Sequence, residues 1–255
     1  MKLLVSNDDG YLAAGIGALV KALAGAGHEV YVAAPHRQRS AASRSMTLHE
    51  PLRAERVTLS AAPDVPAYAV SGTPVDCVRL ALGNLFPAPD AVLSGVNHGA
   101  NLGTDTLYSG TVAAAHEAAL LGYPAVAVSC CRMDAAHFDT AAHVALRAAE
   151  RLVQSPLPFG VVLNINVPDL PLDGLRGVRC APLAVTRYPL RFAERKDPYG
   201  GTYYWAPGGG KLDVYEEEDV DERWTREGYA VCTPLTYDLT DRAVLGGFDP
   251  DGLLR

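Results

Sequence analysis

Several features are scarce in this 255-residue chain, and each absence removes a class of protein. Lysine and arginine number 22 against 29 aspartates and glutamates, the formal net charge is −7, and no basic run occurs. We therefore expect no surface for nucleic acids. No apolar stretch approaches the roughly 20 residues that span a bilayer, and no basic segment with a cleavage site opens the chain. These absences predict a cytoplasmic protein that does not associate with membranes.

Cysteine is also sparse, with five residues at positions 77, 130, 131, 180 and 232 and no C-x-x-C pair. This spacing argues against a disulfide framework and against a zinc site, so we expect buried free thiols in a reducing compartment. The glycines after the first apolar run do not form G-x-G-x-x-G, so no dinucleotide cofactor is indicated. Without internal repeats or a flexible linker, residues 1–255 read as a single α/β domain.

Short apolar runs alternate with helical patterns along the first two thirds of the chain. The alternation predicts parallel strands joined by right-handed helical crossovers. Residues 161–166 are expected to be the last strand of the main sheet, and residues 229–234 a strand that returns to the body. The other expected strands are residues 3–5, 30–33, 68–70, 91–93 and 125–129, and the expected helices are residues 13–26, 112–121, 135–152 and a segment beginning at Pro74.

Two adjacent carboxylates, Asp8 and Asp9, follow the first expected strand and precede Gly10. In an open α/β sheet, ligands bind at the carboxyl ends of the strands. Neighbouring anions stay ionised when a positive charge lies beside them, and carboxylate oxygens suit hard cations such as Mg²⁺ or Mn²⁺. The same residue types are also the commonest in ordinary turns. On this stretch alone, a metal site and a simple turn remain equal alternatives.

Two further loops would meet this edge of the sheet. Residues 36–45 follow the second strand, and Ser40 or Ser43 could reach whatever Asp8 and Asp9 hold, although a solvated loop is the simpler interpretation. Residues 94–111 combine glycines with polar side chains and end in Ser109-Gly110-Thr111, just before an alanine-rich helix. Serine and threonine there are normal helix caps, but free N–H groups at a helix start also bind anions such as phosphate.

The composition changes after residue 170. Residues 186–225 contain several aromatic side chains, and Gly200-Gly201 and Gly208-Gly209-Gly210 are typical of turns between short strands. A projecting β-hairpin extension has little core of its own. We therefore expect segment 186–225 to pack on a partner subunit.

Several motifs, in order, resemble those of the SurE family (survival protein E, 5′/3′-nucleotidases). They are Ser6-Asn-Asp-Asp-Gly10, Ala34-Pro35 with Arg39-Ser40, Ser71-Gly-Thr-Pro74, Ser94-Gly-Val-Asn97, Asn101-Leu-Gly103, Tyr108-Ser-Gly-Thr-Val-Ala-Ala-Ala115, and Gly228-Tyr229 with Thr233-Pro-Leu235. Two positions depart from the family pattern: Ala41 stands where relatives often have glycine, and Val220-Asp221 where they have Thr-Asp.

The resemblance implies a three-layer αβα sandwich with a Rossmann-like, mostly parallel sheet. It implies a divalent metal, Mg or Mn, held by the residues that match the family's ligands: Asp8, Asp9, Ser40 and Asn97. Phosphate would bind at Ser109, Gly110 and Thr111, with Asn101 nearby. Family members hydrolyse nucleoside monophosphates, some also polyphosphate, and form homodimers or homotetramers by exchanging C-terminal elements.

The residues and the resemblance together predict metal-assisted phosphomonoester hydrolysis, with Asp8 or Asp9 as the catalytic carboxylate. That carboxylate would orient or deprotonate water, or would itself attack and form an aspartyl-phosphate. A phospho-receiver module also pairs acidic residues after its first strand, but it needs a further aspartate and a lysine that are not evident near Ser71 or Ser129. A nucleotide-binding protein without catalysis is the other alternative.

Overall fold

A nine-stranded sheet lies at the centre of the computed structural model, which describes residues 1–188, 190–206, 213–214 and 218–247. The strand order is β3-β4-β2-β1-β5-β6-β7-β13-β8. The six strands from β4 to β7 run parallel. Strand β3 pairs antiparallel with β4, and β13 pairs antiparallel with β7 and parallel with β8. The strands are β1 (Lys2–Ser6), β2 (Glu29–Pro35), β3 (Ala54–Leu59), β4 (Ala62–Val70), β5 (Ala91–His98), β6 (Ala125–Cys130), β7 (Val161–Val167), β8 (Val178–Cys180) and β13 (Ala230–Thr236).

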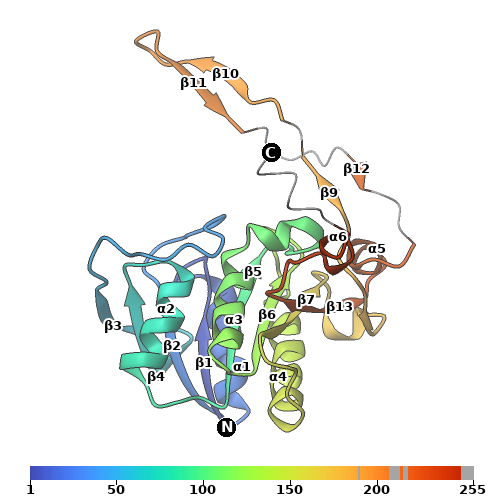
Figure 1. Cartoon of the computed structure of the whole chain (residues 1–255). Coiled ribbons are helices and arrows are strands. Elements are labelled where there is room, and N and C mark those ends of the chain that lie inside the picture. Colours follow the sequence, from blue (N-terminus) through green and yellow to red (C-terminus); the bar gives the residue numbers. More distant parts are fainter. Residues whose placement is uncertain (189, 207–212, 215–217, 248–255) are drawn as a thin grey trace.

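Helices cover both faces of this sheet, which confirms the predicted three-layer arrangement (Figure 1). One buried cluster joins the sheet to α1 and α4, and a second joins the opposite face to α2 and α3. The helices are α1 (Ala14–Gly25), α2 (Pro74–Leu80), α3 (Gly110–Leu120), α4 (Phe138–Gln154), α5 (Asp221–Arg226) and α6 (Arg242–Leu245), with a π-helical turn at Ala81–Leu85 and 3₁₀ turns at Gly103–Leu107 and Leu172–Gly174. No helix among the described residues is long and apolar enough to cross a membrane.

Helix α2 begins where its sequence predicts. The Thr73 hydroxyl accepts a hydrogen bond from the backbone N–H of Asp76 at 3.2 Å, and the Asp76 carboxylate accepts one from the N–H of Thr73 at 2.9 Å. Together with Pro74 in the first turn, this reciprocal cap satisfies N–H groups that have no partner inside the helix. Asp76 also accepts from Thr47, so the same carboxylate holds the loop that follows β2.

Strand β5 extends beyond the predicted residues 91–93 and reaches His98. The sequence shows polar residues from Ser94 onward, which are typical of a loop, but Ser94 and Asn97 are buried and pair with Ala127 and Ser129 of β6. The register of this ladder shifts between Ser94 and Asn97, and such an irregularity re-aims side chains. The strand therefore carries Asn97 to the carboxyl edge of the sheet.

The prediction that residues 161–166 form the last strand of the main sheet is wrong. Strand β13 pairs antiparallel with β7 through six residue pairs, and β8 pairs with β13 beyond it. The returning strand was predicted, but its place in the main sheet depends on pairing between distant segments that periodicity does not reveal. Strand β3 was not predicted, because most of its side chains are exposed or partly exposed and no apolar alternation marks it.

A hairpin of β10 (Ala193–Lys196) and β11 (Thr202–Trp205) projects from the body, as Figure 1 shows. It confirms the predicted turn at Gly200-Gly201; the predicted turn at Gly208–Gly210 lies outside the described residues. Below the hairpin, β9 (Thr186–Arg187) pairs with β12 (Asp213–Val214). All five cysteines are free, as predicted. Only Cys77 and Cys130 are buried, however, since Cys131 and Cys232 are partly exposed and Cys180 is exposed at the edge of the sheet.

Candidate functional site at the carboxyl edge of the sheet

Asp8 is fixed between β1 and the start of α3. The hydroxyl of Thr111 donates to its Oδ1 at 2.5 Å, and the N–H of Arg39 donates to its backbone carbonyl at 2.7 Å. Gly110 makes this approach feasible: a Cβ there would lie 2.8 Å from Cβ of Asp8 and 2.9 Å from its Oδ2. The glycine between Ser109 and Thr111 is therefore required by close packing on the carboxylate.

Asp9 lies beside Asp8 and is only partly buried. Its Oδ2 accepts a hydrogen bond from the backbone N–H of His98 at 3.0 Å, which ties the end of β1 to the end of β5. Burial raises the pKa of Asp9, while His98 acts in the opposite direction. Burial and the charge of Asp9 raise the pKa of Asp8 to about 6, against the lowering effect of the Thr111 hydrogen bond.

Asn97 supplies a third oxygen to this edge. Its Nδ2 donates to the carbonyl of Gly99 at 2.8 Å, so its Oδ1 faces the hydroxyl of Thr111 at 3.4 Å. Because Thr111 also contacts Asp8, one hydroxyl group brings Asp8 and Asn97 into the same cluster. The predicted metal-ligand residues Asp8, Asp9 and Asn97 are thus adjacent at the ends of two neighbouring strands.

The first turn of α3 faces this cluster. The hydroxyl of Ser109 accepts from the N–H of Val112 at 3.1 Å, so Ser109 is the N-cap, as its sequence suggests. The carbonyl of Ser109 accepts the first helical hydrogen bond, from Ala113. The N–H groups of Gly110 and Thr111 precede that bond and have no partner inside the helix. They are suited to oxygen atoms of an anion at the positive end of an 11-residue helix.

The loop after β2 contacts the same region, but Ser40 itself is exposed. Its hydroxyl accepts from Gln38 at 2.9 Å and makes no hydrogen bond to either aspartate. Only the neighbouring N–H of Arg39 reaches Asp8. Further along the loop, Arg44 donates to Nδ1 of the buried His116 on α3 at 2.7 Å. This contact anchors the loop on the helix that carries Thr111.

Asn101 lies in a different polar network. Its Nδ2 donates to the hydroxyl of Ser129, its N–H donates to Asn166, and its carbonyl accepts from Asn164 and Asn166. These bonds hold the loop after β5 down on β6 and β7. No contact among the described residues joins Asn101 to Asp8, Asp9 or Thr111, so its part in phosphate binding stays a prediction.

The residues present fit a hard divalent cation. No lysine or arginine among the described residues forms an ion pair with Asp8 or Asp9, although the two carboxylates are adjacent and at least partly buried. Such a pair is stable in the ionised form only with a compensating charge. The same part of the chain contains no group of three or more His, Cys, Asp or Glu side chains placed to hold a metal. The expected set differs from such groups, since its remaining ligands are amide and hydroxyl oxygens.

Two residues that support the site were not predicted. Asp221 is fully buried and accepts hydrogen bonds from the N–H groups of Gly103, Ala184 and Glu222, each at 2.8 Å. It therefore holds the loop after β5 against the start of the projecting segment. His116, the acceptor for Arg44, is the second. The contact of Asp221 with Gly103 and that of His116 with Arg44 each join residues more than 70 positions apart, and no local pattern in the sequence signals them.

Comparisons with known proteins agree with this arrangement. The family model for "Survival protein SurE" matches residues 3–189. A protein of Synechococcus elongatus called 5′-nucleotidase SurE is 46% identical over 255 residues, covering 98% of both chains. One of the same name from Aeromonas hydrophila is 46% identical over 249 residues, covering 97% of this chain and 96% of the relative.

Similarity extends to a solved structure. The crystal structure of the SurE protein from Aquifex aeolicus superimposes with a TM-score of 0.83 and 34% sequence identity, and the match covers all of both chains. The family model spans more than half of this chain, and the two relatives match nearly all of it. The chain belongs to the SurE family.

Proposed function

We propose that this chain is a metal-dependent phosphomonoesterase that hydrolyses nucleoside 5′-monophosphates to nucleoside and phosphate. The observation that carries the proposal is the pair Asp8 and Asp9, which lacks a cationic partner among the described residues and lies against the first turn of α3. Relatives named 5′-nucleotidase support the choice of substrate. Nucleoside 3′-monophosphates and short polyphosphates are further candidate substrates.

Asp8, Asp9, Asn97 and Ser40 would hold Mg²⁺ or Mn²⁺, with Ser40 joining the set if its hydroxyl exchanges Gln38 for the ion. When bound, the ion would neutralise negative charge and make water a better nucleophile. The N–H groups of Gly110 and Thr111 would bind phosphoryl oxygens. Thr111 would also keep Asp8 in place, because its hydroxyl donates to that carboxylate.

Asp8 or Asp9 would take a proton from the attacking water or direct it towards phosphorus. Direct attack by the carboxylate, with an aspartyl-phosphate as intermediate, is the alternative. Replacing Asp8 by asparagine abolishes both routes and does not separate them. Trapping a phosphorylated aspartate during turnover separates them, since only the second route forms that species.

We further propose one α/β domain over residues 1–255, in which segment 186–225 joins subunits into a homodimer or homotetramer in the cytoplasm. Exposed apolar side chains on the described part of that segment support this assignment; they include Leu190, Phe192, Tyr199, Tyr204 and Trp205. So many exposed large apolar side chains in one segment are typical of a surface that packs on another protein. Size-exclusion chromatography with light scattering measures the oligomeric state directly.

The first experiment measures phosphate release from a panel of nucleoside monophosphates after chelation, and again after Mg²⁺ or Mn²⁺ is restored. Asp9→Asn and Asn97→Ala are expected to abolish the metal-dependent release. Asp64→Asn and Asn84→Ala, at exposed positions, are the matched controls and should retain it. Release that survives chelation would contradict the metal mechanism. No release with any metal would indicate a nucleotide-binding protein without catalysis.

A further inference from the structure

A cavity of about 440 Å³ lies at the carboxyl edge of the sheet, away from Asp8. Four segments line it: the loop after β5, the turns after β6 and β7, and α5 with the turn into β13. These segments contribute Ala100 and Leu102, Arg132, Asp169, and Thr225 with Arg226. The volume is that of a small-molecule site. Because β13 runs antiparallel to β7, its first residues reach the same edge as the ends of the parallel strands.

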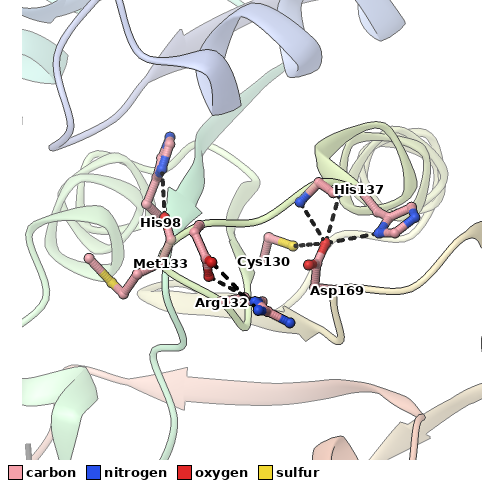
Figure 2. Close-up of polar contacts among 8 residues, drawn as sticks. His98, Cys130, Arg132, Met133, His137 and Asp169 are labelled. Atoms are coloured by element: carbon pink, nitrogen blue, oxygen red, sulfur yellow. Dashed lines mark hydrogen bonds and ion pairs between the residues drawn. The ribbon is translucent and has the colours of Figure 1, made fainter.

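The cavity shares a wall with the proposed phosphate site. Ala100 and Leu102 lie in the loop that follows Asn97 and the end of β5, and the turn after β6 contacts the end of β5 and lines the cavity. Figure 2 shows this turn between His98 and Asp169: the carbonyl of Met133 lies 3.4 Å from Nδ1 of His98, and Arg132 also lines the cavity. Adjacent strands are about 4.8 Å apart, so the ends of β5 and β7 lie about 10 Å from each other. A nucleotide spans this separation between its phosphate and its base.

The cavity presents both hydrogen-bond acceptors and guanidinium groups. Oδ1 of Asp169 accepts from the N–H groups of Ala136 and His137 and from the ring of His137, at 2.8–3.0 Å (Figure 2). Burial acts to raise the pKa of Asp169, but these hydrogen bonds more than offset it, and the pKa lies below its ordinary value. The carboxylate is therefore ionised at neutral pH, and no hydrogen bond from the described residues occupies Oδ2.

The two arginines differ in their partners. Arg132 forms an ion pair with Asp134 at 2.7 Å, which orients its guanidinium. Arg226 is exposed at the cavity, and its guanidinium makes no hydrogen bond or ion pair with any residue that the structure describes. An unpaired planar guanidinium can lie over the face of a nucleobase or donate to its acceptors. A carboxylate beside it accepts from ribose hydroxyls or base N–H groups.

We propose that this cavity is the nucleoside subsite of the enzyme, with Asp169 accepting hydrogen bonds from the sugar or base and Arg226 covering the base. The inference rests on the proposed function, because it needs the phosphate to lie near Asn97 and Thr111. Mixed acceptor and donor chemistry favours a nucleoside here over a second simple anion, which the Asp169 carboxylate would repel.

The test compares Arg226→Ala with Arg223→Ala, a control one turn earlier on α5 that does not line the cavity. Steady-state kinetics are measured with a nucleoside monophosphate and with p-nitrophenyl phosphate, whose small leaving group lacks a sugar and a nucleobase. We expect Arg226→Ala to raise KM for the nucleotide about tenfold with little change in kcat. Hydrolysis of p-nitrophenyl phosphate should stay within about twofold of wild type, as should both activities of Arg223→Ala.

A binding measurement without turnover separates this inference from the proposed function. Calorimetry with metal-free protein and a free nucleoside should give an affinity that Arg226→Ala weakens about tenfold and Arg223→Ala leaves unchanged. Three outcomes would overturn the subsite. Arg226→Ala could reduce activity equally for both substrates, or Arg226→Ala and Arg223→Ala could have equal effects. The third is an affinity for inorganic phosphate, rather than for the nucleoside, that depends on Arg226. If no phosphate ester is hydrolysed, the proposed function fails, and the calorimetry still decides what the cavity binds.

Discussion

Residues around Asp8 and residues of the β10–β11 hairpin differ in how completely their own chain fixes them. Asp8 is held by contacts from Arg39, Gly110 and Thr111, which come from two separate parts of the chain. In the hairpin, Tyr199 is 97% exposed and Trp205 is 60% exposed. The first region is held by contacts within one subunit, whereas the second has apolar side chains that are exposed in the described structure. Adding a single atom near Asp8 should therefore disturb the geometry of the site. Replacing hairpin side chains should have little effect on the stability of an isolated subunit.

Gly110→Ala tests the sensitive region and should have the largest effect. The new Cβ would lie 2.8 Å from Cβ of Asp8 and 3.1 Å from Cγ of Pro74, so Asp8 or α3 must shift. A displacement of this size should lower kcat/KM for phosphate esters roughly 10²-fold or more. Gly25→Ala is the control, since a Cβ there meets nothing within 4 Å. Wild-type turnover by Gly110→Ala would show that α3 does not position Asp8 in the active enzyme.

A pH titration of stability tests the anchor between Arg44 and His116. Burial, and next the charge of Arg44, lower the pKa of His116 to about 4, whereas an unfolded histidine titrates near 6.5. Between these values the unfolded chain binds a proton that the folded chain does not, so stability falls as pH falls from about 6.5 to 4. This group should account for a loss of about 3 kcal/mol.

Urea unfolding of wild type and His116→Gln across this pH range measures the difference, and the variant should lack that part of the slope. His143→Gln, at an exposed position on α4, should follow wild type. Parallel curves for wild type and His116→Gln would rule out a neutral, buried imidazole under Arg44.

Ala41→Gly tests a strained backbone position. The effect of this substitution should lie between those expected for the two regions. Ala41 has φ of 57°, in the left-handed region where a Cβ is unfavourable. Glycine relieves that strain but adds freedom to the unfolded chain. The net result should be a gain of about 0.5 kcal/mol in the free energy of unfolding. The matched variant Ala42→Gly, at a neighbour without positive φ, should instead lose stability.

Replacing hairpin aromatics tests the tolerant region and should have the smallest effect on a lone subunit. Tyr204→Ser with Trp205→Ser should change the free energy of unfolding by less than about 0.5 kcal/mol under conditions that keep subunits apart. The same double variant should weaken assembly, as measured by light scattering over a concentration series. A large loss of stability in the monomer would show that these rings pack on their own chain.

Much of the central sheet follows from local sequence. The run Leu3-Leu4-Val5, the cap at Thr73 and the alanine-rich helix after Ser109 each carry a local signal, and each forms as predicted. The structure also brings Asp8, Asn97, Gly110 and Thr111 together.

Other features depend on residues far apart in the chain. Strand β5 continues through Ser94, which pairs with both β1 and β6, to Asn97, which pairs with β6 alone, and this pairing overrides the loop-like composition. Asp221 and Gly103 are 118 positions apart. Propensity and periodicity describe neighbours along the chain, so neither could predict that a carboxylate beside the returning strand would hold the loop after β5.

Asp221 has a mechanical consequence. Its carboxylate accepts hydrogen bonds from N–H groups of the loop after β5, of the base of the projecting segment and of its own helix. The backbone of Gly103 also lies so close to Ala184 that a Cβ would be 2.6 Å from the Ala184 carbonyl oxygen. The base of the projecting segment and the loop that carries Asn101 thus share one support, which lies two residues from Asn101. Under the proposed assembly, a force applied to the tip of the segment by a neighbouring subunit would be transmitted to the edge of the proposed nucleotide site.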